Sequence, residues 1–299
     1  MPKNTSSSRR TRGRTLAAAE NITYTAALRR LDAMKTHEHE ISCVTPTMTR
    51  GMLPLFDPGA RPYWKRAHGP ALLTMQPAWS QAPDGRARPM GYPHGGIAML
   101  ILAWLSTRVA RTQKREIDLG PTLADFVCGL GLPATLGAYS TTTVVRRQLQ
   151  TLLECEVQIH GPERAWTRAT PVSAFSVYWD GGGDQDRPWG SVRVSEHLFN
   201  EVMHEAVPID LHVLRRLAQT PRAADAYLWI AGLLADGSMT VPWTAVTARL
   251  AATSTTRLNR HAPSASVVIR EAITTVAAAM PRGVVQVRDT EIVVAGTHH

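Results

Sequence analysis

The sequence lacks any apolar run long enough to span a bilayer. Its longest strictly apolar stretch, Ile97–Leu105, has nine residues, about half of what a transmembrane helix needs. Residues 1–14 contain no apolar segment of the kind found in secretory signals. The three cysteines, Cys43, Cys128 and Cys155, lie far apart without C-x-x-C spacing, which argues against a disulfide framework or a zinc knuckle and favours a reducing compartment. We therefore expect a soluble cytoplasmic protein.

Lysine is also scarce. Four of the 33 basic residues are lysines, which leaves 29 arginines against 24 acidic residues and a net charge of +9. Acidic residues are absent from 1–14 and from 237–270, and both windows contain several arginines. Arginine forks onto phosphates and guanine edges, so this pattern favours a nucleic-acid partner. A GC-rich coding sequence, which favours arginine over lysine, explains the ratio equally well.

Signatures of catalysis are missing too. No lysine follows a glycine, so the chain has no G-x-x-x-x-G-K-[ST] phosphate loop. The nearest approach to a metal-binding pair is His37-Glu38-His39-Glu40, which a solvated surface run explains without a metal. The last tyrosine, Tyr227, lies far from the C-terminal position of a recombinase nucleophile. We expect no enzyme activity, no metal, no cofactor, no membrane contact and no small-molecule substrate.

Composition divides the chain into four parts. Residues 1–14 are expected to form a disordered basic tail, and 15–50 a short helix at 15–35 followed by a linker. Prolines recur between residues 51 and 93 and predict extended segments and turns. We place a first domain at 51–195 and a second at 196–299. The hydrophobic content of 44% supports globular cores in both.

After Pro93 one order of elements occurs twice: helix, strand, helix, helix and a two-stranded hairpin. In the first copy we expect helices at 96–113, 121–130 and 141–153, and strands at 116–119, 155–160 and 172–179. In the second copy we expect helices at 221–235, 242–251 and 264–280, and strands at 239–241, 284–288 and 291–294. This is the order of a winged helix, a helix-turn-helix with a β-wing. The sequence thus predicts an α+β fold with two tandem winged-helix domains.

The third helix of the first copy has an apolar side and a polar side when its residues are spaced at about 100°. The polar side carries Thr143, Arg146, Arg147 and Gln150. Arginine reads guanine, glutamine reads adenine and hydroxyls contact phosphates, so these residues fit a major-groove helix. An ordinary solvated helix face is an equally good explanation. The loop 161–170 would place Arg164 and Arg168 at the wing tip, on phosphates, in the minor groove or against a partner subunit.

The second copy has stronger support, because the acid-free window 237–270 covers the joint between its second and third helices. Phosphate contacts are expected at such a joint, and base contacts on the helix that follows. The residues that we expect to contact DNA here are Arg257, Asn259, Arg260, His261, Ser264, Arg270 and Thr274.

The hairpin predicted for the first copy, 155–160 with 172–179, carries apolar side chains on both faces. A soluble protein rarely leaves such a surface uncovered. One face would therefore pair with a second copy of the chain or with the second winged helix. We expect self-association between monomer and dimer.

Several motifs stand out along the chain. They are Tyr92-Pro93-His94-Gly95-Gly96, Leu102-Ala103-Trp104-Leu105, Thr112-Gln113-Lys114-Arg115-Glu116-Ile117, Trp189-Gly190-Ser191 and Val207-Pro208-Ile209-Asp210. These motifs resemble the plasmid-encoded RepA-type replication initiators, and the similarity runs from about Ala60 to Val294. One departure is the segment 133–140, which holds Gly137 and no charge where the family has a basic residue in a glycine-rich turn.

The resemblance implies tandem winged helices in a bacterial plasmid initiator. Such a protein binds repeated double-stranded DNA elements at the origin, promotes melting and recruits the host replicative helicase and initiator proteins. A winged-helix transcriptional or partition regulator and a non-catalytic scaffold are the competing classes. Directly repeated DNA sites favour the initiator, a single palindrome favours the regulator, and no affinity for DNA favours the scaffold.

Overall fold

The structure is a computed structural model of the 299-residue chain. It describes residues 17, 23–24, 41–68, 71–81, 87–135, 137, 139–161, 166–177, 189–251 and 264–296. The predicted basic tail and, apart from residues 17, 23 and 24, the predicted helix at 15–35 lie outside this part of the chain. The described residues form the mixed α+β fold that the sequence predicts.

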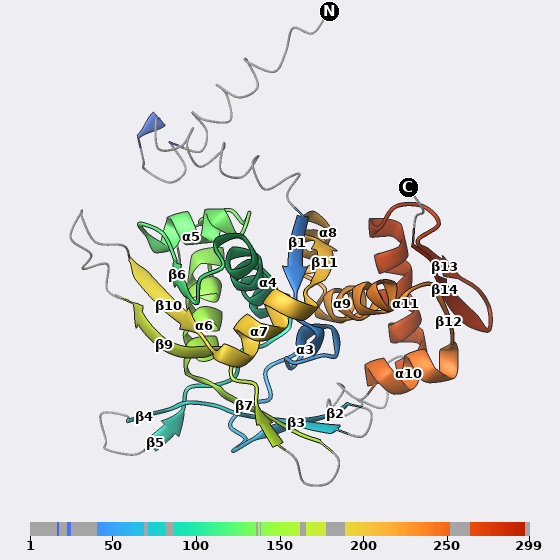
Figure 1. Cartoon of the computed structure of the whole chain (residues 1–299), viewed down its shortest axis with the longest axis horizontal. Coiled ribbons are helices and arrows are strands. Elements are labelled where there is room, and N and C mark those ends of the chain that lie inside the picture. The colour runs from blue at the N-terminus through green and yellow to red at the C-terminus, as the bar shows by residue number, and fades with distance from the viewer. Residues whose placement is uncertain are drawn as a thin grey trace, which may run out of the picture.

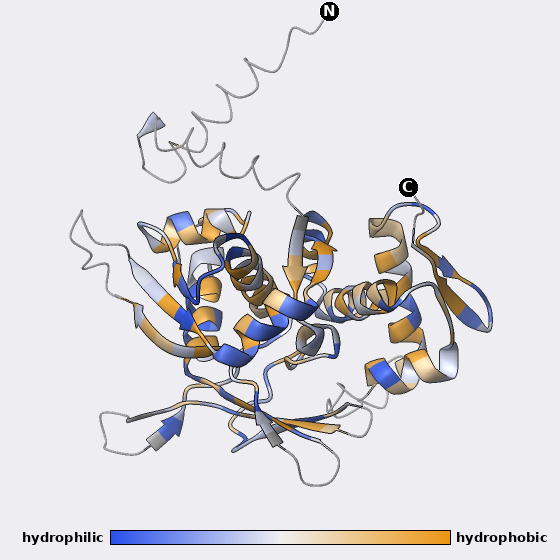
Figure 2. Ribbon diagram, viewed as in Figure 1, coloured by the Kyte–Doolittle hydropathy of each residue, from blue (hydrophilic) through white to orange (hydrophobic). Residues whose placement is uncertain are grey.

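Helix α4 (Gly95–Thr112) lies at the centre of the molecule (Figure 1). Its sequence is apolar on all sides and most of its residues are buried, as expected for a helix inside a core. Figure 2 shows apolar residues along α9 (Pro221–Asp236) and also along strands of the outer sheets. The helix ends at Gln113, whose left-handed backbone (φ 53°) lets its N–H donate to Val109 O.

The predicted elements of the first copy follow α4. They are β6 (Glu116–Asp118), α5 (Leu123–Gly129) and α6 (Thr141–Glu154). A hydroxyl caps the start of each helix, because Thr122 accepts from Asp125 N and Ser140 accepts from Thr143 N. Strand β10 (Gly190–Val194) pairs antiparallel with β6 and with β9 (Val172–Val177), so the sheet order is β6-β10-β9.

The second copy repeats this arrangement. Its elements are α9 (Pro221–Asp236), β12 (Met239–Pro242), α10 (Trp243–Ala251), α11 (Ala265–Ala279), β13 (Val285–Val287) and β14 (Glu291–Val294). The sheet order is β12-β14-β13, so in both copies the last strand lies between the first strand and the middle one. These elements agree closely with their predicted ranges.

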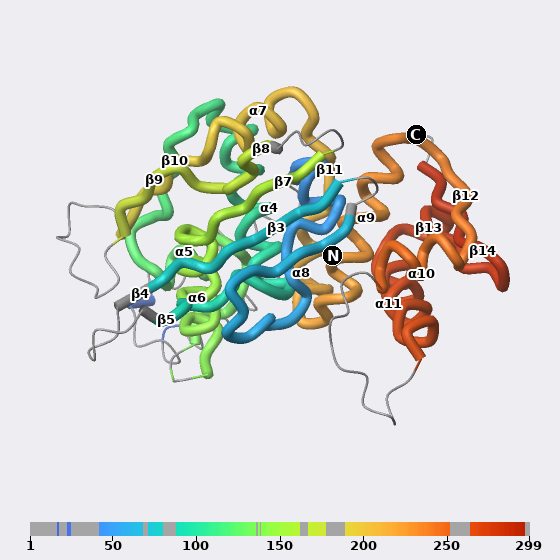
Figure 3. Tube along the Cα trace, turned by 90° about the horizontal axis from the view of Figure 1, so that it is seen from below, coloured from blue at the N-terminus to red at the C-terminus, as the bar shows by residue number. Residues whose placement is uncertain are grey.

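The hairpin predicted for the first copy is wrong in its pairing. Strand β7 (Glu156–His160) pairs with β3 (Ala71–Gln76) and with β8 (Trp166–Arg168), and β2 (Trp64–His68) completes a four-stranded sheet in the order β2-β3-β7-β8. The hairpin partner of β9 is instead β10. Figure 3 shows the four-stranded sheet from below, with β3 beside β7.

The cause of this different pairing is non-local. The proline-rich segment before α4 supplies two strands of this sheet, β2 and β3. The fully buried Met75 of β3 lies opposite the fully buried Val157 of β7. Apolar alternation in β7 therefore reflects the core under this sheet. Val157 forms no part of a surface for self-association, which removes one basis of that expectation.

The remaining elements surround α4. Strand β1 (Ile41–Val44) pairs with β11 (Val207–Asp210), β4 (Trp79–Gln81) pairs with β5 (Ala87–Pro89), and the short helices are α3 (Pro46–Thr49), α7 (Glu196–Glu205) and α8 (Leu211–Leu217). Helices α7, α8 and α9 all contact α4. Buried apolar residues from both copies consequently form one continuous core.

Two close approaches fix α8 and its C-terminal end between the copies. A Cβ added at Gly96 would lie 2.2 Å from Ala218 O, so only glycine lets the start of α4 lie this close to the backbone that follows α8. Arg215 donates from Nε to Leu130 O over 2.8 Å. The second copy is thereby attached to α4 and to the end of α5.

Candidate nucleic-acid interface

Helix α6 buries the side that the sequence predicts. Val145, Leu149 and Leu152 have no exposed surface. Gln148, the one polar residue on this side, is also buried, and its Oε1 accepts a hydrogen bond of 2.8 Å from His94 N at the start of α4. The opposite side of α6 is therefore fixed outward by packing and by a satisfied buried amide.

The four predicted DNA contacts on α6 have different surroundings. Thr143 Oγ1 donates to Gly137 O over 2.9 Å and lies 3.1 Å from Ser140 Oγ, so its hydroxyl orders the start of the helix. Arg147 is 64% exposed and its Nη2 lies 3.6 Å from Asp57 Oδ2. Gln150 forms a hydrogen bond with Glu154. Burial raises the pKa of the Glu154 carboxyl above its usual value, although this hydrogen bond lowers it in part. Arg146 is partly buried.

Of the two arginines predicted for the wing tip, the structure describes only Arg168. Arg168 lies on β8, at the edge of the four-stranded sheet, and its Nη2 pairs with Glu156 Oε1 over 2.6 Å. The antiparallel hairpin that follows is instead β9–β10. Arg164 lies outside the described residues.

In the second copy, α11 buries an apolar stripe of Ile269, Ala272, Ile273 and Val276. Its first polar residue, Ser264, lies at the start of the helix with Oγ 3.0 Å from Ser266 Oγ. Thr274 Oγ1 donates to Arg270 O over 2.9 Å. The predicted loop contacts Arg257, Asn259, Arg260 and His261 lie outside the described residues.

Arg270 has the richest contacts of the predicted residues that the structure describes. Its guanidinium lies 4.1 Å from the ring centroid of Trp243 on α10 and donates to the carbonyls of Arg288 and Asp289. Trp243 Nε1 also donates to Arg288 O, over 2.8 Å. Arg270 therefore joins α11 and α10 to the turn between β13 and β14 while its side chain stays exposed.

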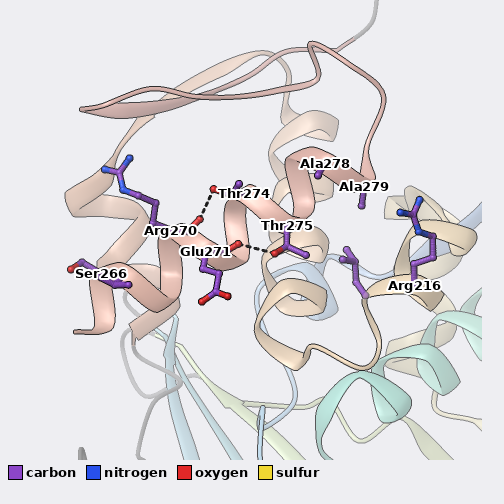
Figure 4. Close-up of a pocket in the computed structure, with 10 residues that line it drawn as sticks. Arg216, Ser266, Arg270, Glu271, Thr274, Thr275, Ala278 and Ala279 are labelled. Atoms are coloured by element: carbon purple, nitrogen blue, oxygen red, sulfur yellow. Dashed lines mark hydrogen bonds between the residues drawn. The ribbon is translucent and has the colours of Figure 1, made fainter. Parts of the chain in front are cut away.

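A groove of about 780 Å³ runs along the outward face of α11, beside the end of α8. Figure 4 shows Arg270 and Arg216 at its two ends and Glu271 between them. The remaining lining side chains are small or apolar: Leu217, Ser266, Val267, Thr274, Thr275, Ala278 and Ala279. Sequence reasoning placed Arg270 and Thr274 on this face but missed Arg216, which comes from another helix, and Glu271, which lies next to Arg270 in the chain.

Two further features concern metal binding and membrane insertion. The described residues include no group of three or more His, Cys, Asp or Glu side chains that could hold a metal ion. Nor does any helix in the described ranges have the length and apolarity to cross a membrane.

Comparison with solved structures adds one similarity of fold. The crystal structure of domains 2 and 3 of RctB superimposes with a TM-score of 0.53 at 10% sequence identity, and the match covers 85% of this chain and 98% of that one. The similarity therefore extends over both copies of the repeated arrangement. No curated protein matches the sequence.

The sequence itself matches one family model, described as "Plasmid encoded RepA protein". The matched region begins at the Tyr-Pro-His-Gly-Gly motif before α4 and ends just after α9. It includes all of the first copy and the first helix of the second. Residues 92–237 are thus similar to the plasmid encoded RepA protein family, which confirms the resemblance that the motifs indicated.

Proposed function

We propose that this chain is a plasmid replication initiator whose two repeated units are winged helices that bind double-stranded DNA. The observation that carries the proposal is the repeated topology. Each unit has a helix, strand, helix, helix and hairpin, with the last strand in the middle of the sheet. The RepA match over residues 92–237 supports the initiator role.

In this proposal α6 and α11 are the recognition helices and β9–β10 and β13–β14 are the wings. A recognition helix presents base-reading side chains from its first turns and leaves the wing beside the phosphate backbone. Arg147 on α6 and Arg270 on α11 are exposed cations on the outward faces of these helices. The fork of Arg270 lies beside the β13–β14 turn, so helix and wing would approach DNA as one rigid surface.

The groove along α11 extends this surface to α8. Arg216 lies at the far end of the groove from Arg270. A second cation at that end suits a phosphate on the neighbouring backbone. The carboxylate of Glu271, between them, accepts hydrogen bonds but donates none. It would therefore favour the cytosine N4 amino group, which is a donor, over a phosphate, which is an acceptor. We propose no catalytic role for any of these residues.

Binding is tested on three duplexes of equal length: an array of direct repeats from the DNA beside the gene, a single palindrome and a scrambled sequence. Fluorescence anisotropy at physiological salt should show specific binding to the direct repeats, tighter than to the scrambled duplex by at least 10³-fold. Preference for the palindrome would favour a regulator, and no affinity for any duplex would favour a scaffold.

Origin melting and helicase recruitment need their own readouts. Permanganate reactivity of thymines in an adjoining A·T-rich tract should rise when the chain is bound to the repeats. The host replicative helicase should be retained on repeat DNA only in the presence of the chain. If the repeats are bound without either effect, the initiator mechanism fails while the DNA-binding assignment stands.

A further inference from the structure

A buried ion pair joins the four-stranded sheet to the second copy. Arg66 on β2 and Asp225 on α9 are 1% and 2% exposed. Arg66 Nη1 donates to Asp225 Oδ1 over 3.2 Å and to Gly51 O over 3.1 Å, and Nη2 donates to Asp225 Oδ2 over 2.9 Å. This bidentate geometry gives each carboxylate oxygen one charge-assisted hydrogen bond.

A second guanidinium belongs to the same cluster. Arg249 on α10 is largely buried and donates from Nη2 to Thr49 O over 3.1 Å. Burial, and then the positive charge of Arg66, lower the pKa of Arg249 to about 10, although Asp225 acts in the opposite direction. Two cations therefore share one carboxylate in a buried position.

Both guanidiniums keep donors without acceptors. Arg66 Nε and Arg249 Nη1 are buried and have no hydrogen-bond partner. A buried unmet donor and an uncompensated charge are each costly. Of these two residues, Arg66 also lines a cavity. An anion in that cavity would accept from Arg66 and offset the excess positive charge of the two arginines.

A cavity of about 100 Å³ lies beside Arg66. Its floor is one row across the sheet, in which Arg66 of β2 faces Leu73 of β3 and Leu73 faces Ile159 of β7. Ala71 borders the same floor, and the opposite wall is formed by Thr47, Arg50 and Gly51 around the end of α3. Arg50 is exposed, so the cavity has a rim at the surface.

The charged residues that line this cavity are both cations, Arg50 and Arg66. The nearby acid Glu201 accepts a hydrogen bond of 2.5 Å from Thr47 Oγ1, and its Oε2 lies 3.7 Å from His197 Nε2. Gly51 has a φ of 86°, and a Cβ there would lie 2.1 Å from the Arg66 guanidinium. No side chain at that position can therefore fill the space.

We propose that this cavity binds a phosphate-sized oxyanion between Arg50 and Arg66. Arg66 directs Nη1 and Nη2 to Asp225, so it would contribute Nε, while the exposed guanidinium of Arg50 supplies a fork that matches the oxygens of a phosphoryl group. The cavity volume is several times what one water requires. Either inorganic phosphate or the phosphoryl group of a mononucleotide supplies this chemistry. A duplex backbone does not, because its phosphates carry a sugar on both sides and this space lies between α3 and the sheet.

The test uses the full chain and two readouts, thermal unfolding and isothermal titration calorimetry. Sodium phosphate is titrated against sodium chloride at equal ionic strength, with AMP and ATP as separate arms. We expect a saturable rise in Tm with phosphate that chloride does not produce. Tighter binding of a nucleotide than of phosphate would identify the nucleotide as the source.

Three variants locate the site. Arg50→Ala should weaken phosphate binding by at least tenfold, and Ala71→Phe should abolish it by filling the cavity without changing a charge. Arg282→Ala removes an exposed arginine near the β13–β14 hairpin and should bind as the parent does. The proposal is overturned if phosphate stabilises the parent no more than chloride does, or if Arg50→Ala and Ala71→Phe respond as Arg282→Ala does.

Discussion

At the scale of single residues, Arg270 shows how one side chain serves structure and surface together. Its contacts with Trp243 and with the carbonyls of Arg288 and Asp289 fix the side chain in place. A fixed guanidinium loses less conformational freedom on binding than a free one. The same contacts that join α11 to the β13–β14 turn therefore hold Arg270 ready for the proposed DNA contact.

Replacing Arg270 separates these two contributions. Arg270→Ala should weaken binding to the cognate repeat by about 1–3 kcal/mol and lower the free energy of unfolding by a further, smaller amount of about 0.5–1 kcal/mol from the lost cation–π contact. Arg270→Lys keeps a cation near Trp243 but loses the fork, so it should retain stability better than affinity. Anisotropy and urea unfolding measure the two effects, and equal losses of affinity in both variants with no loss of stability would contradict the dual role.

The buried cysteines predict how readily their thiols are alkylated at a given pH. Cys43, Cys128 and Cys155 are buried and form no disulfide. Burial raises the pKa of Cys43 to about 11, although Arg111 and Thr107 lower it, and burial raises the pKa of Cys155 to about 12. A raised thiol pKa leaves fewer thiolates, the reactive form, at any pH below it.

Native chain at pH 8 should consequently resist alkylation by iodoacetamide. A shift of the Cys43 pKa from 9.0 to about 11 lowers its thiolate fraction roughly 100-fold. Mass spectrometry of the intact chain should find labelling fast in urea and slow without it. Rapid labelling of the native chain at Cys43 would show that the β1–α4 contact opens readily.

At the scale of elements, the start of α6 decides how its outward face is presented. Ser140 caps the helix, and Thr143 binds Gly137 O in the preceding loop. Ser195 caps α7 in the same way by accepting from Leu198 N. The two serines have the same capping role, but only α6 is proposed to bind DNA.

Ser140→Ala and Ser195→Ala form a matched pair. Each should cost about 1 kcal/mol of stability, because each leaves a backbone donor without its cap. Only Ser140→Ala should also reduce DNA affinity, by loosening the first turn of the proposed recognition helix. Equal affinities of the two variants for repeat DNA would argue that α6 does not bind DNA.

Local patterns predict the helices of both copies because each helix has its own signals. The sides of α6 and α11 follow from 3.6-residue periodicity, and the buried stripes agree with it. The partner of β7 could not be predicted, since pairing with β3 joins residues about 80 positions apart. Arg66 and Asp225 are separated by 159 positions, and no pattern near either residue indicates the other.

The candidate site was predictable in part for the same reason. Outward residues such as Arg147 and Arg270 follow from helical faces. The contact of Arg270 with Trp243, and the place of Arg216 at the end of the α11 groove, depend on how separate elements pack. Arg168 was misplaced because its hairpin was assigned to the wrong sheet.

At the scale of the whole molecule, the Arg66–Asp225 pair links the four-stranded sheet to the first helix of the second copy. Asp225→Ala leaves two buried guanidiniums without a carboxylate and should lower the free energy of unfolding by about 3–5 kcal/mol. The double variant Arg66→Leu with Asp225→Leu should be less destabilised than Asp225→Ala, since it leaves only one buried charge. Urea unfolding measures both, and a double variant less stable than Asp225→Ala would contradict this view of the pair.

The central claim is that two repeated units bind one DNA site through α6 and α11. It is tested most directly by the affinity of the full chain for one directly repeated element, measured over a series of salt concentrations. The variants are Arg147→Ala, Arg270→Ala and the two combined. We predict that each single variant weakens binding, that their effects on the free energy add because the helices contact different parts of the site, and that the parent's slope of log K against log salt indicates several phosphate contacts. Parental affinity in the combined variant, with specific binding intact, would contradict the account.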